Sequence, residues 1–517
     1  MIPPIPTLQE YGLSPNFGFL PNVDPVARIS SPYYEPWEKV ADSLPELIRT
    51  KTVRGVIDAL PMLSLYHLEG EGERRRAYVV LGFLTHAYVW AGDEPAECLP
   101  ATISAPLLEL SDHFEIPPVA TYATVCLWNY HSLNPHQRKD LLSNLRTITT
   151  FTGTHDESWF YLISVAIEAR GAASIPIMLR AIAAARENDA DTVIRALTMF
   201  ADHITDLGEL LDRMDEGCHP NVFYFQIRPF LAGSKNMEDS GLPRGVSYED
   251  RAGNRSWQKY SGGSNAQSSL IQTFDIILGV EHRQTGERKN PSAEQLQGTA
   301  PPAQNNFIQN MRSYMPGSHR RFLEHLTTVA NIKDYANAHA DNLALTAAYN
   351  NALRALAHFR TIHVQMVTRY IILPSSAEKK RIAALAAASS TIGANNNNKQ
   401  RLPQGMALDE PRQGLARDEA SRKGLKGTGG TQLIPFLKQA RDETTEPAIG
   451  EAPSLAPPSA AGVKRPQRVA RPQRVARTPT DFARSCNVNE FEDLNPGFVG
   501  LAGAWSAADD AGGLCHS

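Results

Sequence analysis

The chain has 517 residues, of which 42% are hydrophobic and 21% charged, and its formal net charge is −4. This length and composition are typical of a globular protein with two or three domains and a sizeable apolar core. The nearly balanced charge gives no electrostatic reason to expect a nucleic acid or an anionic membrane as a partner.

The cysteines and the N-terminus argue against secretion. No cysteines form a CxxC pair, so the sequence supports neither a disulfide framework nor a structural zinc site. The opening MIPPIPTLQEYG lacks the basic segment and apolar run of a secretory signal, and the apolar stretches are too short to span a bilayer. We therefore expect a cytoplasmic protein without membrane contact. The cysteines are Cys98, Cys126, Cys218, Cys486 and Cys515.

The first part of the chain predicts an irregular arm followed by helices. The first forty residues are rich in proline and aromatic residues. Beyond them, several segments space their apolar residues three and four apart, as amphipathic helices do. Asp156, Asp189 and Asp191 are candidate helix starts. Because no series of alternating strands is found, the predicted class is all-α. The helical segments are residues 42–63, 73–90, 156–188 and 189–214.

Glycine-containing stretches at 230–245 and 260–282 interrupt this pattern, and the second runs into an apolar helix. A helix then follows Pro316, and a long one runs from about residue 341 to residue 373. We expect that long helix to stop at Pro374, because proline removes a backbone donor.

The C-terminal part changes in composition. An alanine run, the tract ANNNNK and a charged, proline-dotted stretch predict a mobile loop over 375–426. The segment KGTGGTQLIPFLKQARDET, from Lys426, predicts an ordered stretch ending in a short helix. The Pro/Ala/Arg-rich remainder, 441–517, predicts a disordered tail that contains RPQRVA twice in tandem. Such a basic repeat is usually a solvated tail.

Standard catalytic motifs are absent from the sequence, including GxSxG, HExxH, Walker A and a Rossmann fingerprint in context. What remains is His363, which lies among apolar residues on the long predicted helix. The ordinary interpretation is a core histidine with one hydrogen-bonded ring nitrogen. The functional alternative is an axial heme ligand, because heme needs one imidazole, an apolar slot and cations near its propionates. Arg360 lies one helical turn before His363 and could meet a propionate.

Several separated blocks of the sequence decide between these alternatives, because together they resemble the indoleamine 2,3-dioxygenase family and occur in its order. They cover most of residues 20–374 and then 424–440. The resemblance implies an all-α, two-domain fold, with a small domain (1–148) over a larger heme-binding helical bundle (149–440). The blocks are LGFLTHAYVWAG, IPPVATYATVCLWN, FLAGSK, SGGSNAQSSLIQTFDIILGV, YMPGSHRRFL, HVQMVTRYIILP and KGTGGTQLIPFLK.

The resemblance implies that His363, rather than the nearby His319 or His358, is the proximal ligand of the heme iron. It also implies that Arg228 pairs with the substrate carboxylate and that Thr428 lies in a segment closing over the substrate. The implied substrate-binding residues are Tyr122, Phe160, Ser164, Phe223, Arg228, Ser264 and Thr428. The implied heme-binding residues are Val125, Cys126, Gly263, Asn265, Ala266, Asp275 and Arg360, of which the last two form a pair near a propionate.

The activity implied by the resemblance is insertion of both atoms of O2 across the indole C2–C3 bond of L-tryptophan. The product is N-formylkynurenine, in the first step of the kynurenine pathway. The implied cofactor is ferrous heme b, kept reduced by an electron donor, and the resemblance suggests a monomer. One alternative is an oxygen-binding heme protein of the same fold with little or no dioxygenase activity. Another is an enzyme of this fold acting on a different indole. Arg228 favours an amino acid substrate, because a buried arginine needs an anion.

Overall fold

The structure is a computed structural model that describes residues 3–286, 307–393, 426–428 and 432–450. The chain divides into two compact units, Met1–Pro458 and Ser459–Ser517, and all described residues lie in the first. The predicted boundary between a small domain (1–148) and a large domain (149–440) stays a prediction.

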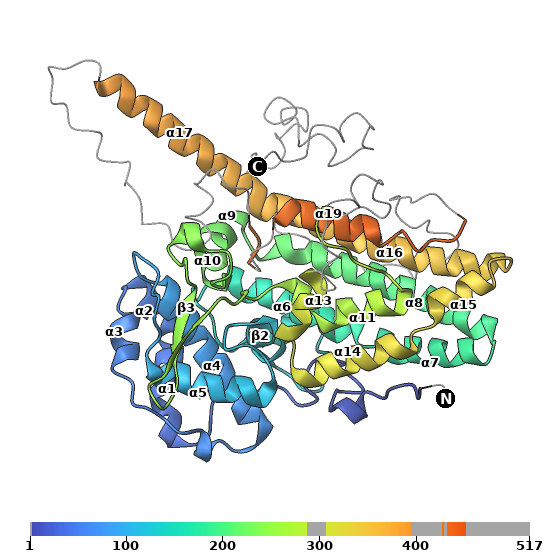
Figure 1. Cartoon of the computed structure of the whole chain (residues 1–517), viewed down its shortest axis with the longest axis horizontal. Coiled ribbons are helices and arrows are strands. Elements are labelled where there is room, and N and C mark those ends of the chain that lie inside the picture. Colours follow the sequence, from blue (N-terminus) through green and yellow to red (C-terminus); the bar gives the residue numbers. More distant parts are fainter. Residues whose placement is uncertain (1–2, 287–306, 394–425, 429–431, 451–517) are drawn as a thin grey trace, which may run out of the picture. The chain divides into compact units, whose positions relative to one another are not determined.

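The described residues form an assembly of helices (Figure 1), which confirms the predicted all-α class. The helices of the first part of the chain are α1 (Glu35–Asp42), α2 (Leu44–Arg49), α3 (Val53–Asp58), α4 (Gly70–Trp90) and α5 (Ala101–Phe114). The helices that follow are α6 (His155–Gly171), α7 (Ser174–Arg186), α8 (Ala190–Leu211), α9 (Pro220–Val222), α10 (Arg228–Leu231), α11 (Ser269–Leu278), α13 (Phe307–Met311), α14 (Gly317–Val329), α15 (Ile332–Ala338), α16 (Leu343–Val367), α17 (Leu373–Gly393) and α19 (Leu433–Glu443).

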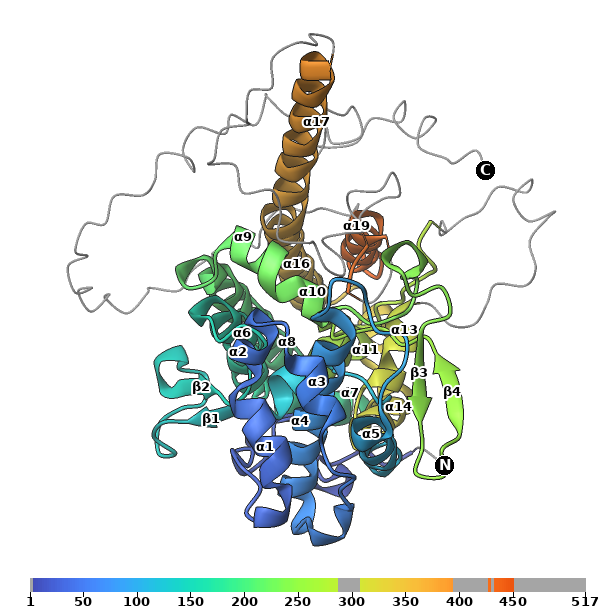
Figure 2. The same ribbon diagram turned by 90° about the vertical axis from the view of Figure 1, so that its left-hand side faces the viewer.

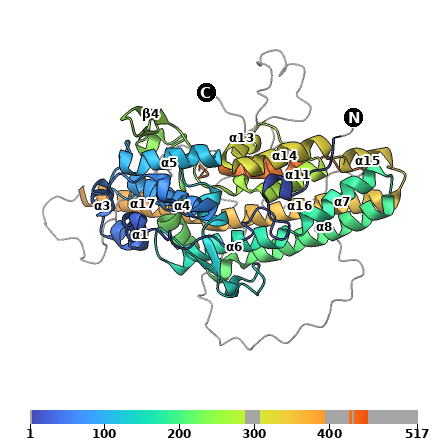
Figure 3. The ribbon, with the colours of Figure 1, turned by 90° about the horizontal axis from the view of Figure 1, so that it is seen from below.

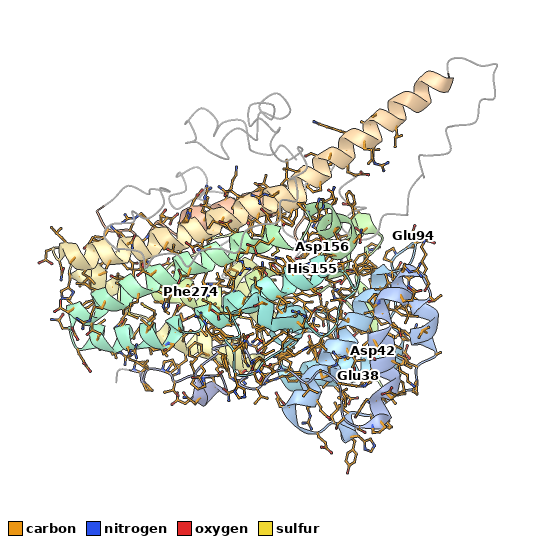
Figure 4. All side chains as sticks on the ribbon, turned by 180° about the vertical axis from the view of Figure 1, so that it is seen from behind. Glu38, Asp42, Glu94, His155, Asp156 and Phe274 are labelled. Carbon is orange, nitrogen blue, oxygen red and sulfur yellow. The ribbon has the colours of Figure 1, made fainter. Side chains whose placement is uncertain are left out.

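The longest helices pack side by side. Helix α16 runs along α8, and α8 also packs against α6 and α7 (Figure 3). Phe274 of α11 lies in the interior (Figure 4), where its ring meets Phe200 of α8 edge to face at 4.9 Å between centroids. The N-terminal helices α1, α3 and α5 surround α4, which is buried along nearly its whole length from Arg76 to Trp90. A helix that is apolar all round belongs in a core.

In the described part of the chain, the strands are short and form two antiparallel pairs. β1 (Tyr130–Ser132) pairs with β2 (Leu145–Thr147), with Tyr130 opposite Thr147. β3 (Val246–Glu249) pairs with β4 (Arg255–Gln258), with Val246 opposite Gln258; both β3 and β4 are visible in Figure 2.

The stretch His155–Arg186 has the length and hydropathy of a membrane-spanning helix, but 72% of its most apolar window is buried inside the protein. A core helix passes the same test of length and composition.

The structure confirms one predicted helix start and corrects another. The Asp189 side chain accepts a hydrogen bond from the Thr192 amide at 3.0 Å, which confirms it as the cap of α8. Helix α6 begins one residue before Asp156 (Figure 4), and its cap is Thr154, which accepts from the Glu157 amide. Asp156 instead accepts from the His219 amide at 2.6 Å, a contact between segments separated by the rest of α6 and by α7 and α8 that the sequence alone does not reveal.

The expected helix end at Pro374 is wrong. A π-helical turn, η11 (Thr368–Ile372), follows α16, and helix α17 continues to Gly393 (Figure 2). The wider π turn relieves the clash of the proline ring with the preceding turn. The alanine run beyond it has high helix propensity. The expected mobile loop (375–426) is therefore wrong as far as residue 393; residues 394–425 lie outside the described part of the chain.

The expected start of the disordered tail at residue 441 is also wrong. Helix α19 continues to Glu443, and both Thr444 and Thr445 are buried. The reason is a set of charged contacts with a distant segment: His282 Nδ1 lies 2.7 Å from the Glu443 carboxylate, and its Nε2 lies 3.3 Å from Asp275. Residues 451–517 lie outside the described part of the chain.

His282 is therefore held between two carboxylates, which makes both ring nitrogens donors. Burial opposes the protonated form and is the largest single effect, but the charge of Asp275 and the hydrogen bonds to Asp275 and Glu443 together outweigh it and raise the pKa of His282 above its usual value of 6.5. We name the contacts of His282 with Asp275 and Glu443 the imidazolium clasp.

A His282→Gln variant tests the imidazolium clasp. Because the histidine pKa is raised on folding, its stabilisation is complete below about pH 6.5 and is lost as pH rises through the folded-state pKa. We expect the variant to lose about 2–4 kcal/mol of unfolding free energy at pH 6. Urea unfolding should show this deficit shrinking toward pH 9, whereas the exposed-site control His136→Gln stays near wild type. A deficit that is constant or grows with pH would contradict the clasp.

Candidate active site

A single cavity of about 240 Å³ brings together every site residue named from the sequence. Its walls come from segments far apart in the chain, and apolar side chains supply most of them. The predicted residues that line it are Tyr122, Val125, Cys126, Phe160, Ser164, Phe223, Arg228, Gly263, Ser264, Asn265, Ala266, Asp275, Arg360, His363 and Thr428.

The helix that carries His363 forms one wall. Arg360 and His363 lie one turn apart on α16, and both reach the cavity. Burial, reinforced by the charge of Arg360, lowers the pKa of His363 to about 4, so the imidazole is neutral at pH 7. Within the described part of the chain, neither ring nitrogen of His363 forms a hydrogen bond. A neutral imidazole facing a cavity is the form that ligates a metal.

The other histidines near this block lie elsewhere. His319 is buried at the start of α14, where Nδ1 lies 3.1 Å from the Ser269 hydroxyl and the ring packs on Phe19. His358 does not line the cavity. The alternatives to His363 that the sequence offered are thus not brought to this site.

The donor set suits heme rather than a bare metal ion. In the part of the chain that the structure describes, no group of three or more His, Cys, Asp or Glu side chains could hold a metal ion. A heme iron needs only one protein ligand on one face, because the porphyrin supplies four others. His363 in a largely apolar cavity, with Arg360 one turn away, meets that need.

Arg360 forms an ion pair with Asp275 of α11. One guanidinium nitrogen lies 2.7 Å from both carboxylate oxygens, and the other nitrogen donates to the Thr444 hydroxyl. Burial of Asp275 opposes its ionisation, but Arg360 and His282 outweigh that effect and lower the pKa of Asp275. The cationic edge expected for a propionate is thus anchored to the imidazolium clasp.

Two π-helical turns also form part of the cavity wall. η4 (Ala123–Leu127) presents Val125 and Cys126, and η7 (Phe223–Ile227) begins with Phe223. π-turns re-aim side chains and are frequent at functional sites. The third such turn among the described residues, η11, contributes Tyr370 and Ile371, so each of them borders the cavity.

Aromatic rings form a corner of the cavity. The rings of Phe160 and Phe223 lie 4.8 Å apart between centroids, and Tyr370 meets Phe223 edge to face at 5.8 Å. The Tyr370 hydroxyl is fixed by the Cys218 carbonyl at 2.7 Å and the Asp215 carboxylate at 2.9 Å. This corner offers faces and edges against which a flat aromatic ligand can pack.

Arg228 brings a buried positive charge to the same cavity. Its side chain is completely buried, and one nitrogen donates to the Lys426 carbonyl at 2.5 Å. The Tyr224 ring lies 5.5 Å away, in cation–π range. A buried guanidinium is stable only with anionic or carbonyl partners, so this end of the cavity selects a negatively charged group.

Two glycine-containing segments, 426–428 and 262–266, meet at the cavity. The Thr428 hydroxyl donates to the Gly263 carbonyl at 2.7 Å, and the Gly262 amide donates to the Thr428 carbonyl at 3.2 Å. Lys426 pairs with Gln432 in an isolated antiparallel bridge. The segment expected to close over a ligand therefore lies against the small-residue turn at 263–266.

Most of the apolar residues that line the cavity were not predicted from the sequence. These residues carry no signal beyond that of ordinary core residues, since only the fold brings them together. Helix α19 supplies several of them. The additional lining residues are Ile167, Leu211, Met214, Leu231, Ser268, Ile271, Gln272, Phe307, Ile308, Phe359, Met366, Val367, Tyr370, Ile371, Gly427, Leu433, Phe436, Leu437 and Ala440.

Comparison with known proteins points to a single family. A family model described as "Indoleamine 2,3-dioxygenase" matches residues 7–447. Indoleamine 2,3-dioxygenase of Saccharomyces cerevisiae is 42% identical, covering 86% of this chain and 94% of that protein. 6-Hydroxytryptophan 2,3-dioxygenase of Fusarium equiseti is 35% identical, covering 85% and 97%. Human indoleamine 2,3-dioxygenase 2 is 32% identical, covering 85% and 95%.

A Gly262→Ala variant tests the close approach of the cavity segments. A Cβ at Gly262 would lie 2.0 Å from the Leu231 carbonyl oxygen and 2.5 Å from the Gly233 amide nitrogen, so the backbones must separate. We expect a loss of about 1–3 kcal/mol of unfolding free energy, measured by urea denaturation. Gly55 lies on α3, and a Cβ added there would have no neighbouring atom within 4 Å. The control variant Gly55→Ala should therefore leave the unfolding free energy unchanged or raise it by up to about 1 kcal/mol. Equal stability of the two variants would contradict the packing described.

Proposed function

The chain belongs to the indoleamine 2,3-dioxygenase family, and we propose that it is a heme-dependent dioxygenase that converts L-tryptophan and O2 to N-formylkynurenine. The observation that carries the proposal is one apolar cavity that holds the neutral imidazole of His363 and the buried guanidinium of Arg228. The imidazole suits an iron ligand, and the guanidinium suits a carboxylate.

His363 would hold the iron of heme b, and the Arg360–Asp275 pair would hold its charged groups. The turn at 263–266 together with Val125 and Cys126 would complete the walls around it. When bound in its ferrous form, heme supplies the iron at which dioxygen is activated. The remaining chemistry of the site is positioning and exclusion of water.

The protein's own residues orient the substrate. Arg228 would clamp the carboxylate, since a planar guanidinium can donate two parallel hydrogen bonds to it. The corner formed by Phe160 and Phe223 would hold the indole ring, and Tyr122, Ser164 and Ser264 complete the walls around it. The Thr428 segment would cover the amino acid end. Such fixed orientation supplies much of the rate enhancement when the reactive unit is a cofactor.

We assign no side chain an obligatory acid or base role. The lining carboxylate, Asp275, is already engaged by Arg360 and His282, and so is not free to take a proton from the substrate. Both oxygen atoms are transferred to the indole C2–C3 bond, so the net reaction releases no proton that a side chain must carry away.

The proposal includes a cytoplasmic, monomeric enzyme that relies on a separate electron donor to keep the iron ferrous. The alternative is an oxygen-binding heme protein of the same fold with little or no dioxygenase activity. Arg228 favours the enzyme, because an oxygen carrier has no use for a buried carboxylate clamp at its cavity.

An Arg228→Met variant tests the function through substrate choice. Tryptamine lacks the carboxylate, so the variant should lose about 10–100-fold in kcat/KM for L-tryptophan while turnover of tryptamine changes little. The heme absorption should be retained. Arg195→Met, at an exposed position on α8, is the matched control and should behave as wild type.

An Arg228→Met protein that keeps wild-type kcat/KM for L-tryptophan would contradict the proposed pairing of Arg228 with the substrate carboxylate. A wild-type protein that binds heme but forms no N-formylkynurenine would favour the oxygen-binding alternative.

A further inference from the structure

Glu168 is a buried carboxyl group that the proposed chemistry does not use. It lies on α6, one helical turn after Ser164, and its exposed fraction is 1%. Its Oε1 atom accepts hydrogen bonds from the Tyr122 hydroxyl at 3.0 Å and from the Ser268 hydroxyl at 2.7 Å. Among the described residues, its Oε2 atom has no hydrogen-bond partner. Two hydroxyls thus converge on one oxygen, and the other oxygen is left bare.

Both hydroxyls belong to residues that line the cavity, and they come from different elements. Tyr122 directly precedes the π turn η4, and its amide donates to the Gln267 side chain at 2.8 Å. Ser268 caps α11, where its hydroxyl also accepts from the Ile271 amide. Glu168 therefore ties α6, η4 and α11 together behind the wall that faces the substrate.

Among the described residues, no charged group near Glu168 compensates a negative charge on its carboxyl. Burial raises its pKa to about 7, and the hydrogen bonds from Ser268 and Tyr122 only partly offset that effect. The titratable groups that face it are Tyr122 and Cys126, and burial raises the pKa of both, so they stay neutral. Within the described part of the chain, no cationic side chain contributes to its ionisation.

This arrangement suits a protonated carboxyl group. Its carbonyl oxygen accepts both hydroxyls, and the group carries no charge into the apolar wall. If Glu168 lost its proton, the bare Oε2 would carry negative charge without a donor. An uncompensated buried carboxylate is costly, so the wall would have to admit water or rearrange.

We propose that Glu168, in its protonated form, is a positioning residue that holds Tyr122 and Ser268 in the substrate-facing wall and keeps that wall dry. The proposal rests on the proposed dioxygenase function and deepens it. It makes substrate turnover depend on the protonation of a group that touches neither substrate nor cofactor.

The test is the pH profile of L-tryptophan turnover between pH 6 and 8, using full-length holoenzyme. If only the protonated form supports the wall, wild-type kcat/KM falls about tenfold over this range, since a group titrating near 7 is about one-tenth protonated at pH 8. Glu168→Gln keeps the carbonyl acceptor and the shape but cannot ionise. It should retain the activity seen at pH 6 and lose the pH dependence. Glu168→Ala should be impaired at every pH.

Two further measurements keep the proposal testable if Glu168→Gln fails to fold. Tyr122→Phe removes a donor that lowers the carboxyl pKa, so its profile should shift to higher pH. Infrared absorption of the wild-type protein should show a protonated carboxyl C=O band that disappears with a midpoint near pH 7 and is absent from Glu168→Gln. This readout does not require turnover.

A Glu168→Gln enzyme with the wild-type pH profile would overturn the proposal, as would the lack, in the wild-type protein, of any titrating carboxyl band that Glu168→Gln removes. Wild-type protein without dioxygenase activity at any pH would instead contradict the proposed function, and the infrared titration would still report on Glu168.

Discussion

The site depends on the ion pair between Arg360 and Asp275. It joins α16, which carries His363, to α11, and both side chains are nearly buried, with 11% and 7% of their surface exposed. Removing one partner of such a pair costs about 3–5 kcal/mol, because the other charge is left buried and alone. Through the imidazolium clasp the same carboxylate also reaches α19, whose apolar side chains close the cavity. One buried network of charges thus fixes the histidine, the cationic edge and the C-terminal wall together.

Different groups of residues in the cavity have different proposed roles. In the proposed function the ion pair and His363 hold the cofactor, Arg228 binds a carboxylate, and the aromatic corner packs on a flat ring. Glu168 stands behind the wall and touches only the groups that form it. The polar atoms are few, so each of them orients a ligand without filling the cavity with water.

Much of this could be read from the sequence, and the failures have identifiable causes. The helical periodicity predicted α4, α6, α7 and α8, because amphipathic spacing is a local signal. From its own segment, His363 could not be distinguished from an ordinary core histidine, and its assignment as an iron ligand rests on the separated blocks taken together. Pro374 was misread because a π turn widens the helix before it. Residues 441–450 were wrongly predicted to be disordered, because their order depends on the contact between Glu443 and His282, which lies 161 residues earlier in the chain. Local composition does not reveal such a distant contact. Glu168 gave no signal at all, since its role follows from burial.

The measurement that tests the central claim most directly is the absorption spectrum of the purified, ascorbate-reduced protein, followed after addition of L-tryptophan in air. We expect a heme Soret band in the wild-type protein that is lost or strongly altered in His363→Ala, and accumulation of N-formylkynurenine by the wild type alone. A wild-type protein that binds no heme, or a His363→Ala protein that binds heme and forms product as the wild type does, would contradict the account.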